Sequence, residues 1–262
     1  MRRTLFRRHA VAVVSAVSLT LLVGACGADK SADAPAKGDA KGSPSAPAKE
    51  EPAAKALTAA ELEKAAIEQA DLTTHLVTKG TKADEVPPGA VKTDKAECKP
   101  LLDTFSAVPS GKPVAHLLRK AVEKPAKTKT DPKATEEEKA KAGLNALTQP
   151  VTADVLASYE AKGAQDAYTA LGKAAQTCSG GFSGEQAGEK IKIKKIVPDQ
   201  VTGGDEAQGW TITMEGDGSD VVLKLAAVRK GSTLATFSTI SLGGTVKAQP
   251  TAVIEAQLKK LG

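Results

Sequence analysis

AQGWTITM at residues 207–214 and VVLKLAAVR at residues 221–229 are the two stretches that decide the fold. In the first, Trp210 and Ile212 alternate with polar residues, and the second begins with the same alternation. A period of two is typical of a β-strand that buries one face. Because the turn residues 216–218 (GDG) leave only a short connection, the two strands are expected to pair antiparallel.

Two further strands and a helix extend this pair. Residues 190–197 and 233–242 favour strands, and residues 230–231 (KG) mark a turn before the second of them. Residues 251–261 carry apolar residues at helical spacing, and Pro250 suits the first turn of a helix. The last third of the chain therefore predicts an antiparallel meander closed by a helix.

Helical and strand patterns alternate in the middle of the chain. Thr58 and Glu61 form a capping box, which predicts a helix over residues 59–70. Apolar spacing predicts helices from Cys98 onward and over 164–178, a loop over 80–95, and strands over 73–78, 114–122 and 151–160. The fold class is thus α+β, an antiparallel meander sheet with helices packed against one face. We expect a single domain over residues 57–262, with a solvated low-complexity excursion near residues 123–145.

The N-terminus has the pattern of an export signal. Four arginines within the first eight residues precede an uncharged apolar segment over residues 10–23. That segment is shorter than the roughly 20 residues that cross a bilayer. A basic region, a short apolar region and small residues at a cut site describe a signal peptide, expected over residues 1–25. Residues 2–6 (RRTLF) also resemble a twin-arginine signal, and the choice between that route and the general secretory route stays open.

Residues 23–26 (VGAC) resemble the lipobox of bacterial lipoproteins. The resemblance implies that Cys26 receives a diacylglyceryl group with fatty acids such as palmitate, and that the chain is cut just before it. Two acyl chains hold a protein stably at a membrane, so we expect a cell-membrane protein anchored on the extracytoplasmic side. An ordinary signal peptide with a chance cysteine, or an uncleaved anchor, is the alternative.

After the cut, the chain is close to neutral and begins with a tether. Residues 1–25 hold four of the 36 basic residues and no acidic residue, which leaves 32 basic residues against 31 acidic ones. This balance gives no reason to expect a nucleic-acid partner. Residues 26–56 have hardly any large apolar side chain, so we expect a disordered tether.

Once Cys26 is lipidated, Cys98 and Cys178 remain as an even pair in an exported protein. Such a pair favours a disulfide, because the compartment outside the cell membrane is oxidising. Two buried thiols and a metal site are the rival interpretations. Two cysteines without a nearby histidine cannot complete a zinc site, so no metal is expected.

The sequence offers no recognisable catalytic residue. His75 and His116 lie in apolar segments, where a packed histidine is more common than a base. Residues 181–184 (GFSG) lack the spacing of a nucleophile elbow. Asp217 and Asp220 lie in a tight turn, where they more often form the turn than bind calcium. We therefore expect neither an enzyme nor a cofactor.

Three motifs together resemble a known exported domain: Cys98 followed by the apolar residues of 99–103, a helix ending at Cys178 with Phe182 after it, and residues 204–207 (GDEA) with Trp210. They are similar to the extracellular sensor domain of PknH-type mycobacterial receptor serine/threonine kinases and to related actinobacterial lipoproteins. The resemblance implies an antiparallel sheet with helices against it and a cleft for an unknown ligand. The extracellular domain of these kinases carries two disulfides, whereas this chain has cysteines for one.

The sequence leaves three hypotheses for the domain. The first is a non-catalytic ligand-binding or sensor-like module on a lipid tether, with ligand-binding residues unknown. The second is a carrier of lipid or glycolipid in the cell envelope, which needs a large apolar cavity. The third is a scaffold that binds another envelope protein. The many alanines and few large apolar residues favour a compact core and hence the first hypothesis.

Overall fold

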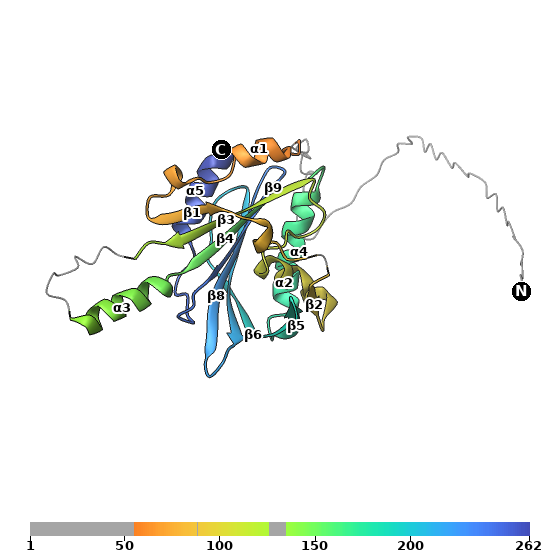
Figure 1. The fold of residues 1–262 in the computed structure, drawn as a ribbon. Coiled ribbons are helices and arrows are strands. Elements are labelled where there is room, and N and C mark those ends of the chain that lie inside the picture. Colours follow the sequence, from red (N-terminus) through yellow and green to blue (C-terminus); the bar gives the residue numbers. More distant parts are fainter. Residues whose placement is uncertain (1–54, 88, 126–134) are drawn as a thin grey trace, which may run out of the picture. The chain divides into compact units, whose positions relative to one another are not determined.

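The structure, a computed structural model, describes residues 55–87, 89–125 and 135–262, which belong to one domain (Figure 1). The strands of these residues are, in chain order, β1 (His75–Lys79), β2 (Val91–Thr93), β3 (Ala115–Glu123), β4 (Val151–Ser158), β5 (Phe182–Gln186), β6 (Glu189–Asp199), β7 (Glu206–Glu215), β8 (Asp220–Lys230) and β9 (Thr233–Ile240). Their α-helices are α1 (Ala59–Lys64), α2 (Lys99–Phe105), α3 (Glu136–Leu147), α4 (Gly163–Thr177) and α5 (Thr251–Leu261).

The strands form one antiparallel sheet in the order β1-β3-β4-β9-β8-β7-β6-β5-β2. Strands β5 to β9 follow one another as a meander. β4 pairs with β9 and is followed by α4, after which the chain continues at β5 on the far side of the meander. The α+β class and the antiparallel meander expected from the sequence are confirmed.

Helices cover both faces of the sheet, which corrects the expectation that they pack against one face only (Figure 1). One buried cluster joins α2 and α4 to the sheet, and a second joins α1 and α5 to the opposite face. The physical reason lies in the central strands, because Leu225 and Ala227 on β8 face the first cluster while Ala226 and Val228 face the second. A strand that is apolar on both sides must be covered on both sides.

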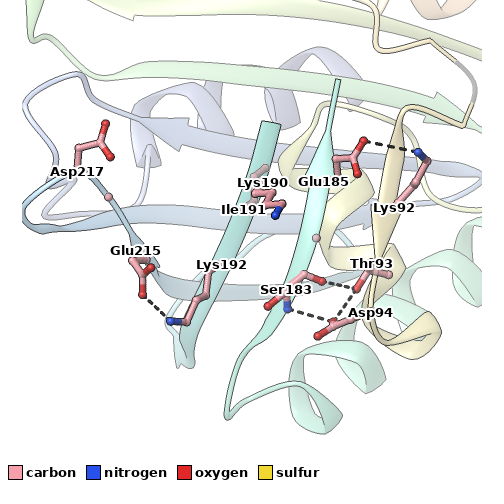
Figure 2. A pocket seen from close by; sticks show the side chains of 12 residues that line it. Lys92, Thr93, Asp94, Ser183, Glu185, Lys190, Ile191, Lys192, Glu215 and Asp217 are labelled. Carbon is pink, nitrogen blue, oxygen red and sulfur yellow. Dashed lines mark hydrogen bonds and ion pairs between the residues drawn. The ribbon is translucent and has the colours of Figure 1, made fainter. Parts of the chain in front are cut away.

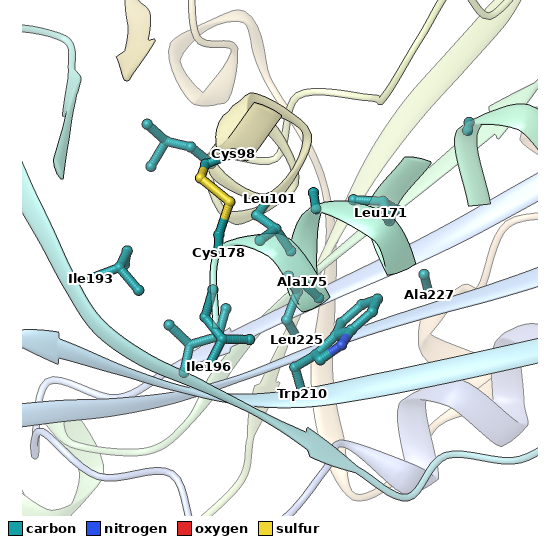
Figure 3. Close-up of a cluster of buried hydrophobic side chains, with 14 of the residues drawn as sticks. Cys98, Leu101, Leu171, Ala175, Cys178, Ile193, Ile196, Trp210, Leu225 and Ala227 are labelled. Atoms are coloured by element: carbon teal, nitrogen blue, oxygen red, sulfur yellow. A yellow bond between two sulfur atoms is a disulfide. The ribbon is translucent and has the colours of Figure 1, made fainter. Parts of the chain in front are cut away.

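The cluster under α2 and α4 contains the only tryptophan and the disulfide (Figure 3). Trp210 on β7 and Leu225 on β8 are 5% and 0% exposed, and they pack beneath Leu171 of α4. Cys98 and Cys178 are bonded, with their Cα atoms 5.9 Å apart. The bridge therefore joins the start of α2 to the end of α4 inside the core.

Four local features differ from the expectations. The first helix ends at Lys64, and residues 69–71 form a separate 3₁₀ turn instead of continuing to residue 70. The region expected as a loop contains β2, and β5 was not expected at all. Part of the expected solvated excursion is the helix α3, which begins with a capping box between Thr135 and Glu138.

The described helices include none that is long and apolar enough to cross a membrane.

A buried acidic side chain lies between the sheet and α1. Asp154 on β4 is fully buried, and neither carboxylate oxygen has a hydrogen-bond partner among the described residues. Arg119 is opposite it on β3, but Arg119 Nη2 lies 2.8 Å from Glu63 Oε1 on α1, and its Nε donates to the Ile67 carbonyl. Burial raises the pKa of Asp154 to about 8, against a smaller opposing effect of the Arg119 charge.

Asp154→Asn is expected to raise the free energy of unfolding at neutral pH by about 2 kcal/mol. The unfolded chain loses the Asp154 proton near pH 3.8 and the folded chain near 8, so wild-type stability falls as the pH rises between these values. Each unit of difference is worth about 1.4 kcal/mol, part of which the unpaired buried amide of asparagine cancels. Urea unfolding at several pH values measures this, and a gain equally large near pH 4 would contradict it.

Candidate functional site: a charged hollow on the sheet

On one face of the sheet, three of the nine strands are not covered by a described helix. The cluster beneath α1 and α5 draws on β1, β3, β4, β7, β8 and β9, but on no described residue of β6, β5 or β2. On these three strands the residues of the opposite face, such as Val91, Phe182 and Ile193, are buried under α2 and α4. Their neighbours in sequence therefore point away from that core and into solvent.

The side chains on this uncovered face are charged and line a hollow of about 670 Å³, which we name the charged hollow (Figure 2). The strand register forms two rows across it. Lys92, Glu185 and Lys190 lie opposite one another on β2, β5 and β6. Ser183 lies opposite Lys192, whose Nζ is 2.6 Å from Glu215 Oε2 on β7. Residues far apart in sequence thus meet in one hollow on the sheet.

The short edge strand β2 is fixed to β5 by side-chain hydrogen bonds. The Ser183 amide donates to Asp94 Oδ1 at 3.0 Å, and the Thr93 hydroxyl donates to the Ser183 carbonyl at 3.1 Å (Figure 2). Gly184 allows this close approach, because a Cβ there would lie 2.4 Å from Leu102 Cδ2 and 2.8 Å from the Lys92 carbonyl oxygen. The wall of the hollow formed by β2 is therefore held in a defined position.

Two charges of the hollow have no partner among the described residues. Lys92 and Lys192 are paired with Glu185 and Glu215, at 3.6 and 2.6 Å. Lys190 on β6 and Asp217 in the β7–β8 turn make no ion pair or hydrogen bond in the described part of the chain. Exposed pairs contribute little to stability. The arrangement can instead bind a molecule that carries both a negative and a positive group.

The residues singled out from the sequence lie in separate places. The Cys98–Cys178 bridge is in the core, and Cys26 lies outside the described residues. His75 is at the start of the edge strand β1, and His116 on β3 lies opposite Ala157, so the two are not brought together. Asp217 lines the charged hollow. Asp220 is paired with Lys194 at 2.8 Å.

No group of three or more histidine, cysteine, aspartate or glutamate side chains that could hold a metal ion is found within residues 55–87, 89–125 and 135–262. The charged hollow offers ammonium groups, carboxylates and two hydroxyl groups. This set supplies electrostatic attraction and hydrogen bonds to a bound molecule.

One feature of the sequence points to this site. Residues 190–195 read KIKIKK, so the lysines alternate with isoleucines that point into the core. That pattern predicts a lysine-rich face on β6. The carboxylates that surround these lysines come from β5, from the end of β7 and from the β7–β8 turn, and the register of the sheet brings them to β6.

Comparisons with known proteins give a likeness of fold to solved structures. Neither a family model nor a curated protein matches the sequence. Among solved structures, the crystal structure of the extracellular domain of PknH from Mycobacterium tuberculosis matches with a TM-score of 0.48 and 10% identity, covering 79% of this chain and 97% of that one. The sequence motifs resemble the extracellular domain of kinases of this type. The identity is too low to carry any site residue from that domain to this chain.

Proposed function

We propose that the protein is an exported lipoprotein, anchored at the extracytoplasmic side of the cell membrane through Cys26, with a non-catalytic, sensor-like binding domain. The lipobox-like residues 23–26 support the anchor. The buried Cys98–Cys178 bridge supports an oxidising compartment, since structural disulfides are typical of exported proteins. Both features belong to a protein that works outside the cytoplasm.

The ligand in this proposal binds in the charged hollow and carries charges of both signs, as a zwitterion or a mixed-charge peptide does. The observation that carries the proposal is the unpaired state of Lys190 and Asp217 on the lining of one hollow, next to two lysines whose charges are already paired. Opposite charges on a concave surface select a ligand of complementary pattern and speed its arrival.

The lipid-carrier hypothesis receives less support from the cavities. A carrier needs a large interior space lined by aliphatic side chains. Four hollows of about 540 to 670 Å³ in the described chain are each lined partly by charged residues. A scaffold that binds another envelope protein would use the same uncovered sheet face, with the partner's charges in place of the ligand's.

Native mass spectrometry of the full chain purified from host membranes tests the proposal. We expect a bound species of low mass that carries both amino and acidic groups, and we expect Lys190→Glu to reduce its occupancy at least fivefold by reversing an unpaired charge. Lys259→Glu is the matched control, because Lys259 is an exposed lysine on α5 outside the hollow.

Two outcomes would contradict this assignment. A co-purifying lipid would favour the carrier hypothesis. Equal occupancy in Lys190→Glu and in Lys259→Glu would remove the charged hollow as the binding site.

A further inference from the structure

A second hollow, separate from the charged one, lies on the α5 side of the sheet. It has a volume of about 670 Å³ and is formed where β3 ends, β4 begins and β9 ends, beside the start of α5. Its floor includes Thr152 on β4 and Thr239 on β9, which are opposite one another in the sheet. We name it the hydroxyl hollow.

The lining of the hydroxyl hollow is polar and nearly uncharged. His75, Glu123 and Lys247 are its titratable side chains, and burial lowers the pKa of His75, which favours its neutral form. Glu123 and Lys247 are exposed and carry opposite charges. Six of the remaining lining residues carry a hydroxyl group: Thr148, Thr152, Thr239, Ser241, Thr245 and Thr251.

The floor has a spare hydrogen-bond donor. The hydroxyl oxygens of Thr152 and Thr239 are 2.9 Å apart, and both residues are 2% exposed. One hydroxyl hydrogen lies between the two oxygens, so the other is left over, and no further acceptor for it is found among the described residues. A buried donor without an acceptor costs stability unless a bound molecule supplies one.

The wall has a spare acceptor. Gln249 lines the hollow, and its Nε2 donates to Asp199 Oδ2 at 3.1 Å and to the Trp210 carbonyl at 3.3 Å. Its Oε1 is buried and has no partner among the described residues. A donor and an acceptor left free around one hollow match a hydroxyl group, which both donates and accepts.

A partly buried ion pair between Lys224 and Asp199 holds Gln249 in this orientation. Asp199 Oδ2 also accepts from Lys224 Nζ at 2.7 Å and from the Thr211 hydroxyl at 3.0 Å. Lys224 is only 7% exposed. Its ammonium group donates a hydrogen bond to Asp199 and lowers the pKa of that carboxyl group to about 2. The carboxylate thus stays charged and keeps the amide nitrogen of Gln249 turned toward it. A fixed polar group of this kind lowers the entropy cost of binding.

From these observations we propose that the hydroxyl hollow binds a small neutral polyhydroxylated molecule, of the size of a mono- or disaccharide. Its volume lies within the range of small-molecule sites. The lining contains neither a run of charges for an anion nor an apolar wall for an acyl chain. This site is independent of the charged hollow.

The test uses the full chain in a detergent without a sugar headgroup, and saturation-transfer NMR with maltose as the neutral probe and glucose 6-phosphate as the charged comparison. We expect saturable binding of maltose, at least fivefold weaker binding of glucose 6-phosphate, and at least fivefold weaker maltose binding in Thr152→Val. Thr236→Val is the matched control, because Thr236 is buried on β9 but faces the other side of the sheet. Lys190→Glu should bind maltose as the wild type does, which separates this site from the charged hollow.

A second variant guards against a folding defect in Thr152→Val. Thr245 is exposed at the hollow, so Thr245→Trp should fill the space without disturbing the core and should abolish maltose binding. Absence of saturable binding to the wild type, equal binding of the charged sugar, or unchanged binding in both Thr152→Val and Thr245→Trp would overturn the proposal.

Discussion

Cys98→Ser is expected to lower the free energy of unfolding by about 4 kcal/mol and the melting temperature by about 10 °C under oxidising conditions. The bridge closes a loop with a sequence separation of 80 residues, so it strongly restricts the unfolded chain. The loop contains β3, β4 and α4, so two of the nine described strands lie within it. Loss of the bond also leaves the thiol of Cys178 and a new hydroxyl inside the cluster under α2 and α4.

Differential scanning calorimetry of wild type and variant measures this effect. The control is the double variant Cys98→Ser with Cys178→Ser, which should melt close to the single variant because the bond is already absent. Added reductant should leave the melting temperature of both variants unchanged. A single variant that melts within about 2 °C of the wild type would show that the bridge does not hold the domain together.

The positions of the strands could be predicted from the sequence better than the number of their faces that are buried. In β7, Trp210, Ile212 and Met214 alternate with polar residues, and this half-buried pattern identified the meander correctly. In β8 the apolar residues 225–228 (LAAV) are continuous, a pattern typical of a strand that is buried on both faces. The alternation at the start of β8 predicts burial of one face only, so it does not predict the second helical layer.

Short and polar elements could not be predicted from their own residues. β2 has three residues and β5 carries a glycine at its centre, so neither has an apolar pattern of its own. β5 is stabilised by pairing with β6, and β2 by pairing with β5. The hydrogen bond from the Ser183 amide to Asp94 joins residues 89 positions apart. The charged hollow depends on that pairing, so its lining followed from the fold and not from any motif.

Cys26→Ala is expected to move the protein from the membrane fraction to the soluble fraction, or to leave an uncleaved precursor. Without the sulfur there is no site for the diacylglyceryl group, and a processed chain would lose its two acyl chains. Two buried acyl chains give stable anchoring, whereas a folded domain without them has no comparable attachment. Cell fractionation followed by immunoblotting measures both the location and the size of the chain.

The matched control for this experiment is Cys98→Ser, which also removes one cysteine but leaves Cys26 in place, and it should remain in the membrane fraction. A Cys26→Ala protein that stays fully membrane-bound and has the mature size would show that another part of the chain provides the anchor.

The lipid anchor at Cys26 is the claim on which location, export and the proposed role all rest. Mass spectrometry of the N-terminal peptide of the mature chain, from cells fed a labelled fatty acid, tests it directly. We expect a peptide that begins at Cys26 and carries a labelled diacylglyceryl group. A mature N-terminus elsewhere, or an unmodified Cys26 without label, would contradict it.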